Sequence, residues 1–120
     1  MKEMLSWTFS RECDVPPDIN YLLIEGEYVV CAYQTIRDIA LFTNKRIIFR
    51  DAQGLTGKKI EVYSLPYKSI LMYSTENAGK LLDINSEVEL WTKAGHIKIN
   101  LSKKADIRRL DRVLAEAILK

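Results

Sequence analysis

The 120-residue sequence predicts one mainly β (α+β) domain that ends in an amphipathic helix. From residue 27 onward, short segments rich in β-branched and aromatic residues alternate with turn signals, which is typical of strands. Near the end, apolar residues recur at the i, i+3 and i+4 positions of a helix. The composition, 48% hydrophobic and 28% charged, is that of an ordinary globular chain with one core. Many short strands with this spacing favour a sandwich or a barrel.

The predicted strands have two kinds of hydrophobic pattern. The last two alternate between apolar and polar residues, as expected of strands with one buried face. Three others are apolar on both faces (39–42, 47–49 and 70–73), so a second layer must cover their outer sides. The candidates for that layer are the N-terminal segment and another subunit. The seven predicted strands are Glu27–Gln34, Ile39–Thr43, Arg46–Asp51, Lys58–Leu65, Ser69–Glu76, Asp83–Thr92 and His96–Leu101.

The first part of the chain, residues 1–24, is interpreted as an N-terminal helical extension of a main domain that spans residues 25–120. Apolar clusters at 4–9 and 19–24 predict one or two short helices. Between them, Val15-Pro16-Pro17 stops any continuous helix, because proline lacks the backbone N–H that a helix interior needs.

The final element is predicted as a helix from Lys103 to Leu119. Its apolar stripe runs from Ile107 to Ile118 and faces one side, as expected of a helix that packs on a core. Ser102 is the expected N-cap, because a serine hydroxyl can accept a hydrogen bond from a free N–H of the first turn.

The charge pattern predicts an attraction between the first part of the chain and its middle. The net charge of +2 argues against a dedicated nucleic-acid binder, which usually carries a strongly basic stripe. Residues 1–34 hold two basic and six acidic side chains, whereas residues 37–68 hold seven basic and three acidic ones. These regions are expected to attract each other, within one subunit or between subunits.

Cysteine usage and the absence of a targeting pattern favour a cytoplasmic protein. Cys13 and Cys31 lack a metal-binding or redox spacing, and no signal-peptide pattern precedes them. Both are therefore predicted to be free thiols in a reducing compartment. No apolar run reaches the roughly 18–20 residues that a membrane span requires.

Catalysis is not predicted. His96 is the only histidine and falls on the polar face of its strand, where a surface role is the ordinary one. One histidine and two distant cysteines do not assemble a standard zinc site, and no nucleophile-elbow motif accompanies His96. We therefore expect a protein without enzymatic activity, metal or cofactor.

Two surface roles are considered instead. Tyr63 and Trp91 alternate out of phase with the apolar face of their strands, and aromatic residues are enriched at protein interfaces. The candidate oligomer interface is Tyr63, Trp91, Phe42, Phe49 and Tyr73. The candidate contacts for an anion or another ligand are Lys45, Arg46, Lys58 and Lys59.

Ordered sequence blocks through the middle of the chain resemble the bacterial pleckstrin-homology (PH) domain family. These blocks include Arg37-Asp38-Ile39, Phe42-Thr43-Asn44-Lys45-Arg46-Ile47-Ile48, Ser64-Leu65-Pro66-Tyr67-Lys68-Ser69-Ile70 and Glu87-Val88-Glu89-Leu90-Trp91. The resemblance implies a PH-like, seven-stranded, bent antiparallel barrel capped by a C-terminal helix. It also implies a family without known catalysis, whose members form ring-like homo-oligomers.

The resemblance does not extend to the lipid site of eukaryotic PH domains, which uses basic residues around the first strand–loop–strand. That connection here holds one base and one acid, Arg37 and Asp38, which are expected to form an ion pair or to shape the hairpin. The leading hypothesis is therefore a non-enzymatic binding or scaffolding module that self-assembles and presents a surface to a protein partner. The alternative is a peripheral module that binds an anionic lipid or an anionic small ligand.

Overall fold

The computed structural model describes residues 4–53, 59–76 and 85–120. In these residues the seven predicted strands are present, with ends shifted by at most two residues where the structure describes them. Asp83, Ile84 and Lys58, which the sequence assigned to strand starts, lie outside the described residues. The strands are β1 (Met4–Cys13), β2 (Val29–Thr35), β3 (Asp38–Thr43), β4 (Arg46–Gln53), β5 (Lys59–Pro66), β6 (Ile70–Glu76), β7 (Ser86–Thr92) and β8 (His96–Leu101), and the helices are η1 (Pro17–Leu22), η2 (Tyr67–Ser69) and α1 (Ile107–Ile118).

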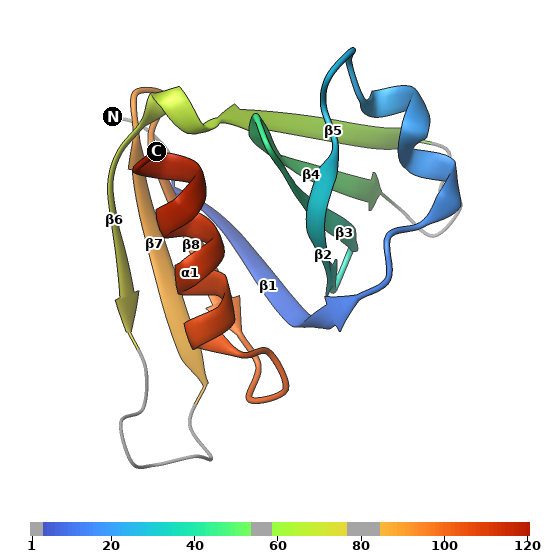
Figure 1. Ribbon diagram of the computed structural model, residues 1–120. Helices are drawn as coiled ribbons and strands as arrows, with labels where there is room; N and C mark the ends of the chain where they lie inside the picture. Colours follow the sequence, from blue (N-terminus) through green and yellow to red (C-terminus); the bar gives the residue numbers. More distant parts are fainter. Residues whose placement is uncertain (1–3, 54–58, 77–84) are drawn as a thin grey trace.

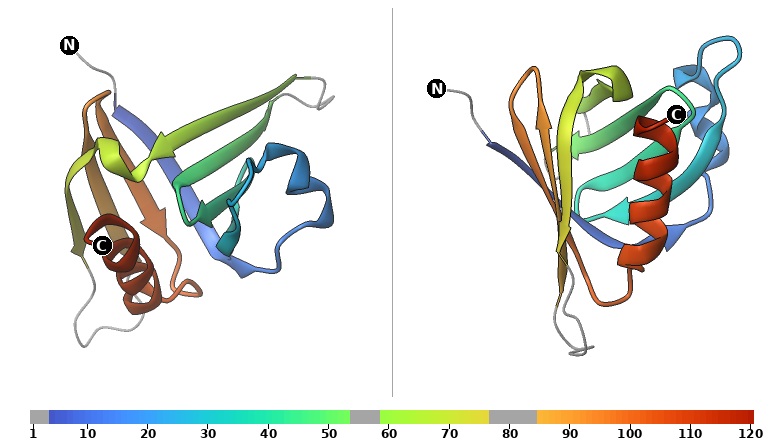
Figure 2. Two further views of the ribbon diagram at one scale, coloured as in Figure 1. Left: turned by 45° about the horizontal axis from the view of Figure 1, so that its top comes forward. Right: turned by 60° about the vertical axis from the view of Figure 1, so that its left-hand side comes forward.

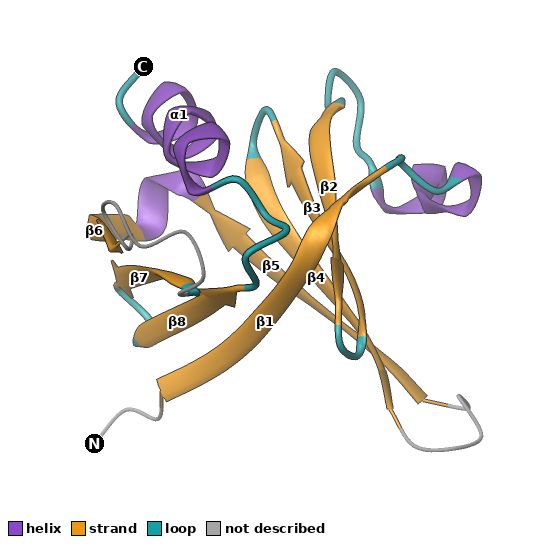
Figure 3. Cartoon of the chain, turned by 90° about the horizontal axis from the view of Figure 1, so that it is seen from below, coloured by secondary structure: helices purple, strands orange, loops and turns teal. Residues whose placement is uncertain are grey.

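All eight strands belong to one strongly bent sheet with the order β5-β4-β3-β2-β1-β8-β7-β6 (Figure 1). Neighbouring strands are antiparallel except β1 and β8, which are parallel. β1 joins the two halves of the sheet. It pairs with β8 from Met4 to Phe9 and with β2 from Phe9 to Cys13, and it therefore crosses the whole molecule (Figure 3).

The predicted helical extension at the N-terminus is wrong. Residues 4–9 form the first half of β1, and residues 17–22 form only a 3₁₀ helix. The physical reason lies in the alternation of Trp7 and Phe9 with small polar residues, which has the period of a strand. Trp7 and Phe9 are buried in the core, whereas Thr8 between them is only half-buried and Ser6 before them is exposed.

α1 fills the concave side of the bent sheet, as the two views of Figure 2 show. Leu110, Val113 and Leu114 of the helix are buried in the same core as Val88 and Ile99 of the sheet. Full burial of each such side chain contributes about 1.5–3 kcal/mol relative to exposure. The apolar stripe predicted from the sequence therefore anchors the helix.

The outer face of the β2–β4 half is covered by the N-terminal segment, one of the two candidates for the second layer. Ile19 of η1 is fully buried and packs in a second cluster with Leu41 and Ile48, among others. The cover does not extend to β5, where the outward side chains of Ile60 and Val62 stay exposed. The sheet therefore carries a residual apolar surface along this edge strand.

The predicted N-cap of the helix is also wrong. Asp106 is the N-cap, and its Oδ1 accepts hydrogen bonds from the backbone N–H groups of Arg108 (3.0 Å) and Arg109 (3.4 Å). The hydroxyl of Ser102 instead donates to the backbone carbonyl of Ser10, so that this serine fastens the end of β8 to β1. Within the described residues, no helix has the length and hydropathy that crossing a membrane would require.

Candidate functional site

A buried ion pair occupies the corner between η1, β2 and β4. Arg46 Nε donates to Glu27 Oε2 at 2.9 Å and Arg46 Nη2 donates to Oε1 at 3.0 Å. Thr43 Oγ1 donates to the same carboxylate at 2.7 Å, and Arg46 also donates to the carbonyl of Leu22. These hydrogen bonds, above all those from Arg46, outweigh the effect of burial and lower the pKa of Glu27 to about 2. Arg46 thus has a structural role.

The predicted anion-binding set is not brought together. Lys45 is exposed at the turn before β4, and Lys59 is exposed at the start of β5. Lys59 pairs with Gln53, at the opposite end of β4 from Arg46. A strand of this length separates its ends by roughly 23 Å, at about 3.3 Å per residue. Lys58 lies outside the described residues, so the described members form no common site.

The ion pair expected between Arg37 and Asp38 is replaced by two pairs, each between one of these residues and a residue of β4. Arg37 Nη1 donates to Asp51 Oδ2 at 3.0 Å, and Arg50 Nε donates to Asp38 Oδ2 at 2.7 Å. Arg50 also lies 3.4 Å from Asp18 of η1. Together with the Glu27 pair, this contact shows that the acidic first segment and the basic middle attract each other within one subunit.

The structure separates the predicted interface aromatics into two groups. Phe42 and Phe49 are buried in the core, since their strands turn these rings toward the concave side. Both rings therefore pack within this chain's own core, and Phe49 also lines a groove on the surface. Tyr63, Tyr73 and Trp91 are half-buried and remain candidates.

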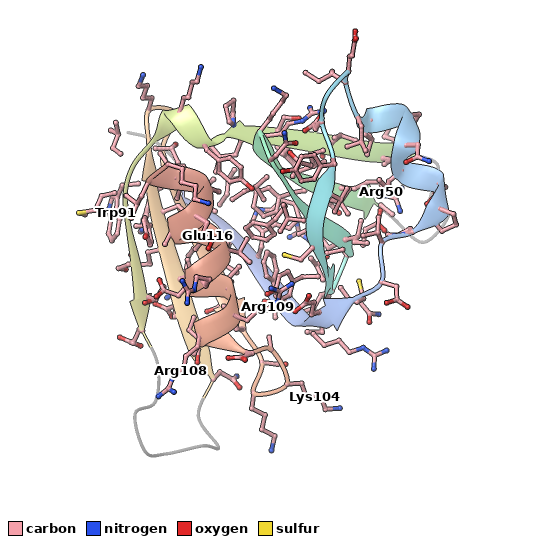
Figure 4. The ribbon with its side chains drawn as sticks, in the orientation of Figure 1. Arg50, Trp91, Lys104, Arg108, Arg109 and Glu116 are labelled. Atoms are coloured by element: carbon pink, nitrogen blue, oxygen red, sulfur yellow. The ribbon has the colours of Figure 1, made fainter. Side chains whose placement is uncertain are left out.

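Trp91 lies on the outer side of the sheet, where its side chain points away from α1 (Figure 4). Its ring stacks on His96 with centroids 5.0 Å apart, and His96 Nε2 lies 2.8 Å from Glu89 Oε2. Its neighbour across the strand pair is Met72 of the edge strand β6, which is 55% exposed. This surface combines exposed apolar groups with a histidine that is fixed by Trp91 and Glu89. Protein interfaces commonly combine apolar and polar groups in this way.

A groove of about 350 Å³ runs along the edge strand β5, between this strand and the start of β8. Tyr63 packs edge-on against Trp7 with centroids 5.6 Å apart, and Trp7 stacks on Phe49 at 4.7 Å. The Tyr63 hydroxyl donates to Glu61 Oε2 at 3.1 Å, and burial together with this carboxylate raises the pKa of Tyr63. The phenol is therefore a neutral hydrogen-bond donor at physiological pH. The lining of the groove includes Trp7, Phe49, Val62, Tyr63, His96 and Ile97.

Trp7 is the residue of this groove that the sequence interpretation missed, because its segment was predicted to be helical. The recurrence of Leu5, Trp7 and Phe9 at every second position, with small polar residues between them, is the signal that identifies a strand. Among the described residues, no group of three or more His, Cys, Asp or Glu side chains is placed to hold a metal ion.

A bent sheet with a C-terminal helix in its concave side defines the PH-like class of folds, and two solved structures of that class match this chain closely. A DUF1696 family protein with a pleckstrin-homology domain from Shewanella loihica PV-4 has a TM-score of 0.80 at 32% identity, covering 90% of this chain and 96% of that one. A pleckstrin-homology domain from Shewanella amazonensis SB2B has a TM-score of 0.70 at 32% identity, covering 86% and 84%.

The chain belongs to the bacterial PH domain family, whose model matches residues 1–118. Two proteins of Bacillus subtilis strain 168 are similar along most of their length. The uncharacterised protein YjqA is 39% identical over 104 residues, which cover 84% of this chain and 82% of YjqA. The uncharacterised protein YozO is 33% identical over 110 residues, which cover 92% and 94%. The match to the family includes residues 1–24, which the sequence pattern had set apart.

Proposed function

We propose that this chain is a non-enzymatic scaffolding module of the cytoplasm that assembles into a homo-oligomer and presents a surface to protein partners. The observation that carries the proposal is the apolar character of both edge strands of the sheet. On β5, Ile60 is 54% and Val62 is 40% exposed. On β6, Leu71 is 68% and Met72 is 55% exposed. Proteins usually protect such edges with charge or cover, so an apolar edge favours association.

A second copy is the occupant that these edges fit best. Each copy carries one β5 edge and one β6 edge, at opposite ends of the same sheet. A contact between β5 of one copy and β6 of the next would bury both apolar surfaces with a single type of interface. Such a contact is heterologous, and repeated heterologous contacts close into a ring when the rotation per subunit permits closure. Tyr63 belongs to the β5 edge and Trp91 lies on β7 beside the β6 edge, so both would then lie at or near the interface.

The outer faces of β7 and β8 supply the surface for a partner. They carry alternating charges, with Lys98 Nζ 3.1 Å from Glu87 Oε2 and His96 beside Glu89. In a ring this polar surface would be repeated once per subunit, which favours a partner that binds several copies at once. The two cysteines are free thiols, which agrees with the proposed reducing compartment.

The native mass tests the proposal most directly. Light scattering coupled to size exclusion at micromolar concentration should give a multiple of the 13.9 kDa chain mass. A clean monomer under these conditions would contradict self-assembly.

Charged substitutions on the edges test the location of the contact. Val62→Lys and Trp91→Arg should each shift the particle toward the monomer, because a buried unpaired charge is costly at an interface. Ile36→Lys is the matched control, since Ile36 is 77% exposed at the β2–β3 hairpin and lies on neither edge strand. Circular dichroism must show that the variants remain folded. If the control dissociates the oligomer as strongly as the edge variants, the contact does not lie at the edges.

A further inference from the structure

A polar depression lies where the two halves of the sheet diverge. At Phe9, β1 changes its partner from β8 to β2, and the register with β2 shifts between Phe9 and Arg11. Ser102, the first residue after β8, stays attached to β1, since its N–H donates to the carbonyl of Phe9 at 3.0 Å. The space beside this junction has a volume of about 660 Å³. It is lined by Ser10, Arg11, Gln34, Asn85, Ser102 and the two lysines Lys103 and Lys104.

The side chains around the depression are predominantly hydrogen-bond donors. Arg11 Nε donates to Gln34 Oε1 at 3.2 Å, so the amide oxygen of Gln34 is engaged and its NH₂ group is left to donate elsewhere. The same bond leaves the two terminal nitrogens of Arg11 for a ligand. Lys103 and Lys104 are exposed, line the same depression and add two ammonium groups.

The positive charge at this place is not compensated by the acids beside it in the sequence. Glu12, next to Arg11, is held by Arg109, whose Nε and Nη2 each lie 3.0 Å from one of its carboxylate oxygens. Asp106 is occupied as the N-cap of α1. None of the seven lining residues is acidic. Figure 4 shows that Lys104 and Arg108 both point outward at this end of the molecule, whereas Arg109 points toward the end of β1.

From this arrangement we infer that the depression binds a multiply charged phosphate group through Arg11, Lys103 and Lys104. An arginine presents two parallel donors to phosphate oxygens, and lysines supply point charges around it. The side-chain NH₂ groups of Gln34 and Asn85 are neutral donors, and they complete a site that can bind several phosphate oxygens. The group belongs either to a soluble phosphate compound or to a phospholipid headgroup, and both sources present the same chemistry. The inference is independent of self-assembly, because all lining residues come from one chain.

Pyrophosphate and phosphatidic acid are suitable probes for the two sources. Calorimetric titration of the wild-type chain with pyrophosphate at low salt should give saturable binding that weakens as salt rises. The amide signals of Ser10, Gln34 and Ser102 should shift in the nuclear magnetic resonance spectrum. In a parallel arm, the chain should co-sediment with phosphatidylcholine vesicles that contain phosphatidic acid more than with vesicles that lack it.

A matched pair of charge variants locates the site. The triple variant Arg11→Gln, Lys103→Gln, Lys104→Gln should weaken binding by about tenfold or more, since it removes three charge-assisted contacts. The triple variant Lys45→Gln, Lys59→Gln, Lys68→Gln removes the same charge elsewhere on the surface and should change binding by less than about twofold. Binding in only one arm identifies the source and supports the site. Equal losses in the two variants, shifts confined to other residues, or no binding in either arm would overturn the inference.

Discussion

The guanidinium of Arg46 contacts both carboxylate oxygens of Glu27, at 2.9 and 3.0 Å, and the Glu27 side chain is completely buried. The pair joins the segment before β2 to the first residue of β4. Because Arg46 also holds the carbonyl of Leu22, one side chain fixes the end of η1, the approach to β2 and the β3–β4 turn. The cover over the outer face of the sheet is therefore held by charge as well as by apolar contacts.

Loss of this pair should destabilise the protein strongly. Glu27→Gln keeps the size of the side chain but leaves the largely buried Arg46 guanidinium without its counter-charge, so we expect a loss of about 3 kcal/mol in the free energy of unfolding. Urea denaturation measures the change. Glu12→Gln is the control, because the Glu12–Arg109 pair is largely exposed and should contribute less than about 1 kcal/mol. Equal effects of the two substitutions would contradict the special role of Glu27.

The same carboxylate predicts how stability depends on pH. The pKa of Glu27 falls from 4.5 to about 2 on folding, so its contribution is fully present above about pH 4.5 and disappears as the pH falls toward 2. The difference in unfolding free energy between the wild type and Glu27→Gln should therefore shrink by roughly 3 kcal/mol over this window. Denaturation series at several pH values measure it. A difference that stays constant between pH 6 and about pH 2 would argue against the shifted pKa.

The N-cap of α1 offers a smaller, local test. Asp106→Ala removes the acceptor for two backbone N–H groups and should cost about 1 kcal/mol. Glu116→Ala lies on the exposed side of the same helix and should change the unfolding free energy by less than about 0.5 kcal/mol. Thermal unfolding followed at a helix-sensitive wavelength compares them. A larger cost for Glu116→Ala would show that the helix does not begin at Asp106.

The two thiols should react at different rates. Cys31 is buried and its pKa is raised to about 11, mainly by burial, so only about one thiol in a thousand is ionised at pH 8. Cys13 is half-buried, and its pKa is raised as well. In the native protein at pH 8, a thiol reagent should label the Cys31→Ser variant faster than the Cys13→Ser variant. Labelling of both variants at the same rate would mean that Cys31 is accessible.

Periodicity predicted the part of the fold in which one face of each element is buried. The alternation in β7 and β8 and the stripe from Ile107 to Ile118 were sufficient to place two strands and the helix. The same signal was present around Trp7, but the short apolar cluster was interpreted as a helix. The nearby prolines reinforced that error, since they mark the end of an element without identifying its type.

The candidate sites depend on long-range register, which local sequence does not encode. Arg46 meets Glu27 because β2 pairs with β3 so that Val29 lies opposite Thr43, beside the β3–β4 turn. Arg37 reaches Asp51 instead of its neighbour Asp38 because the β3–β4 register places Asp38 opposite Asp51. The charge attraction between the first and middle segments was predictable, but its location inside one subunit was not. The depression near Ser102 is a similar case, since it arises where β1 changes its partner from β8, the last strand of the sequence, to β2.

The parallel pairing of β1 with β8 has a consequence for how the chain folds. β1 emerges first during synthesis, yet half of its hydrogen-bonding partners belong to the last strand to be made. The two halves of the sheet can each form from strands that are near in sequence. β1, which joins the halves, cannot complete its pairing until β8 is available. Because such non-local pairing carries a large entropic cost of loop closure, this closing step is expected to limit the rate of folding. Until then, β1 remains an open edge that a neighbouring chain could capture.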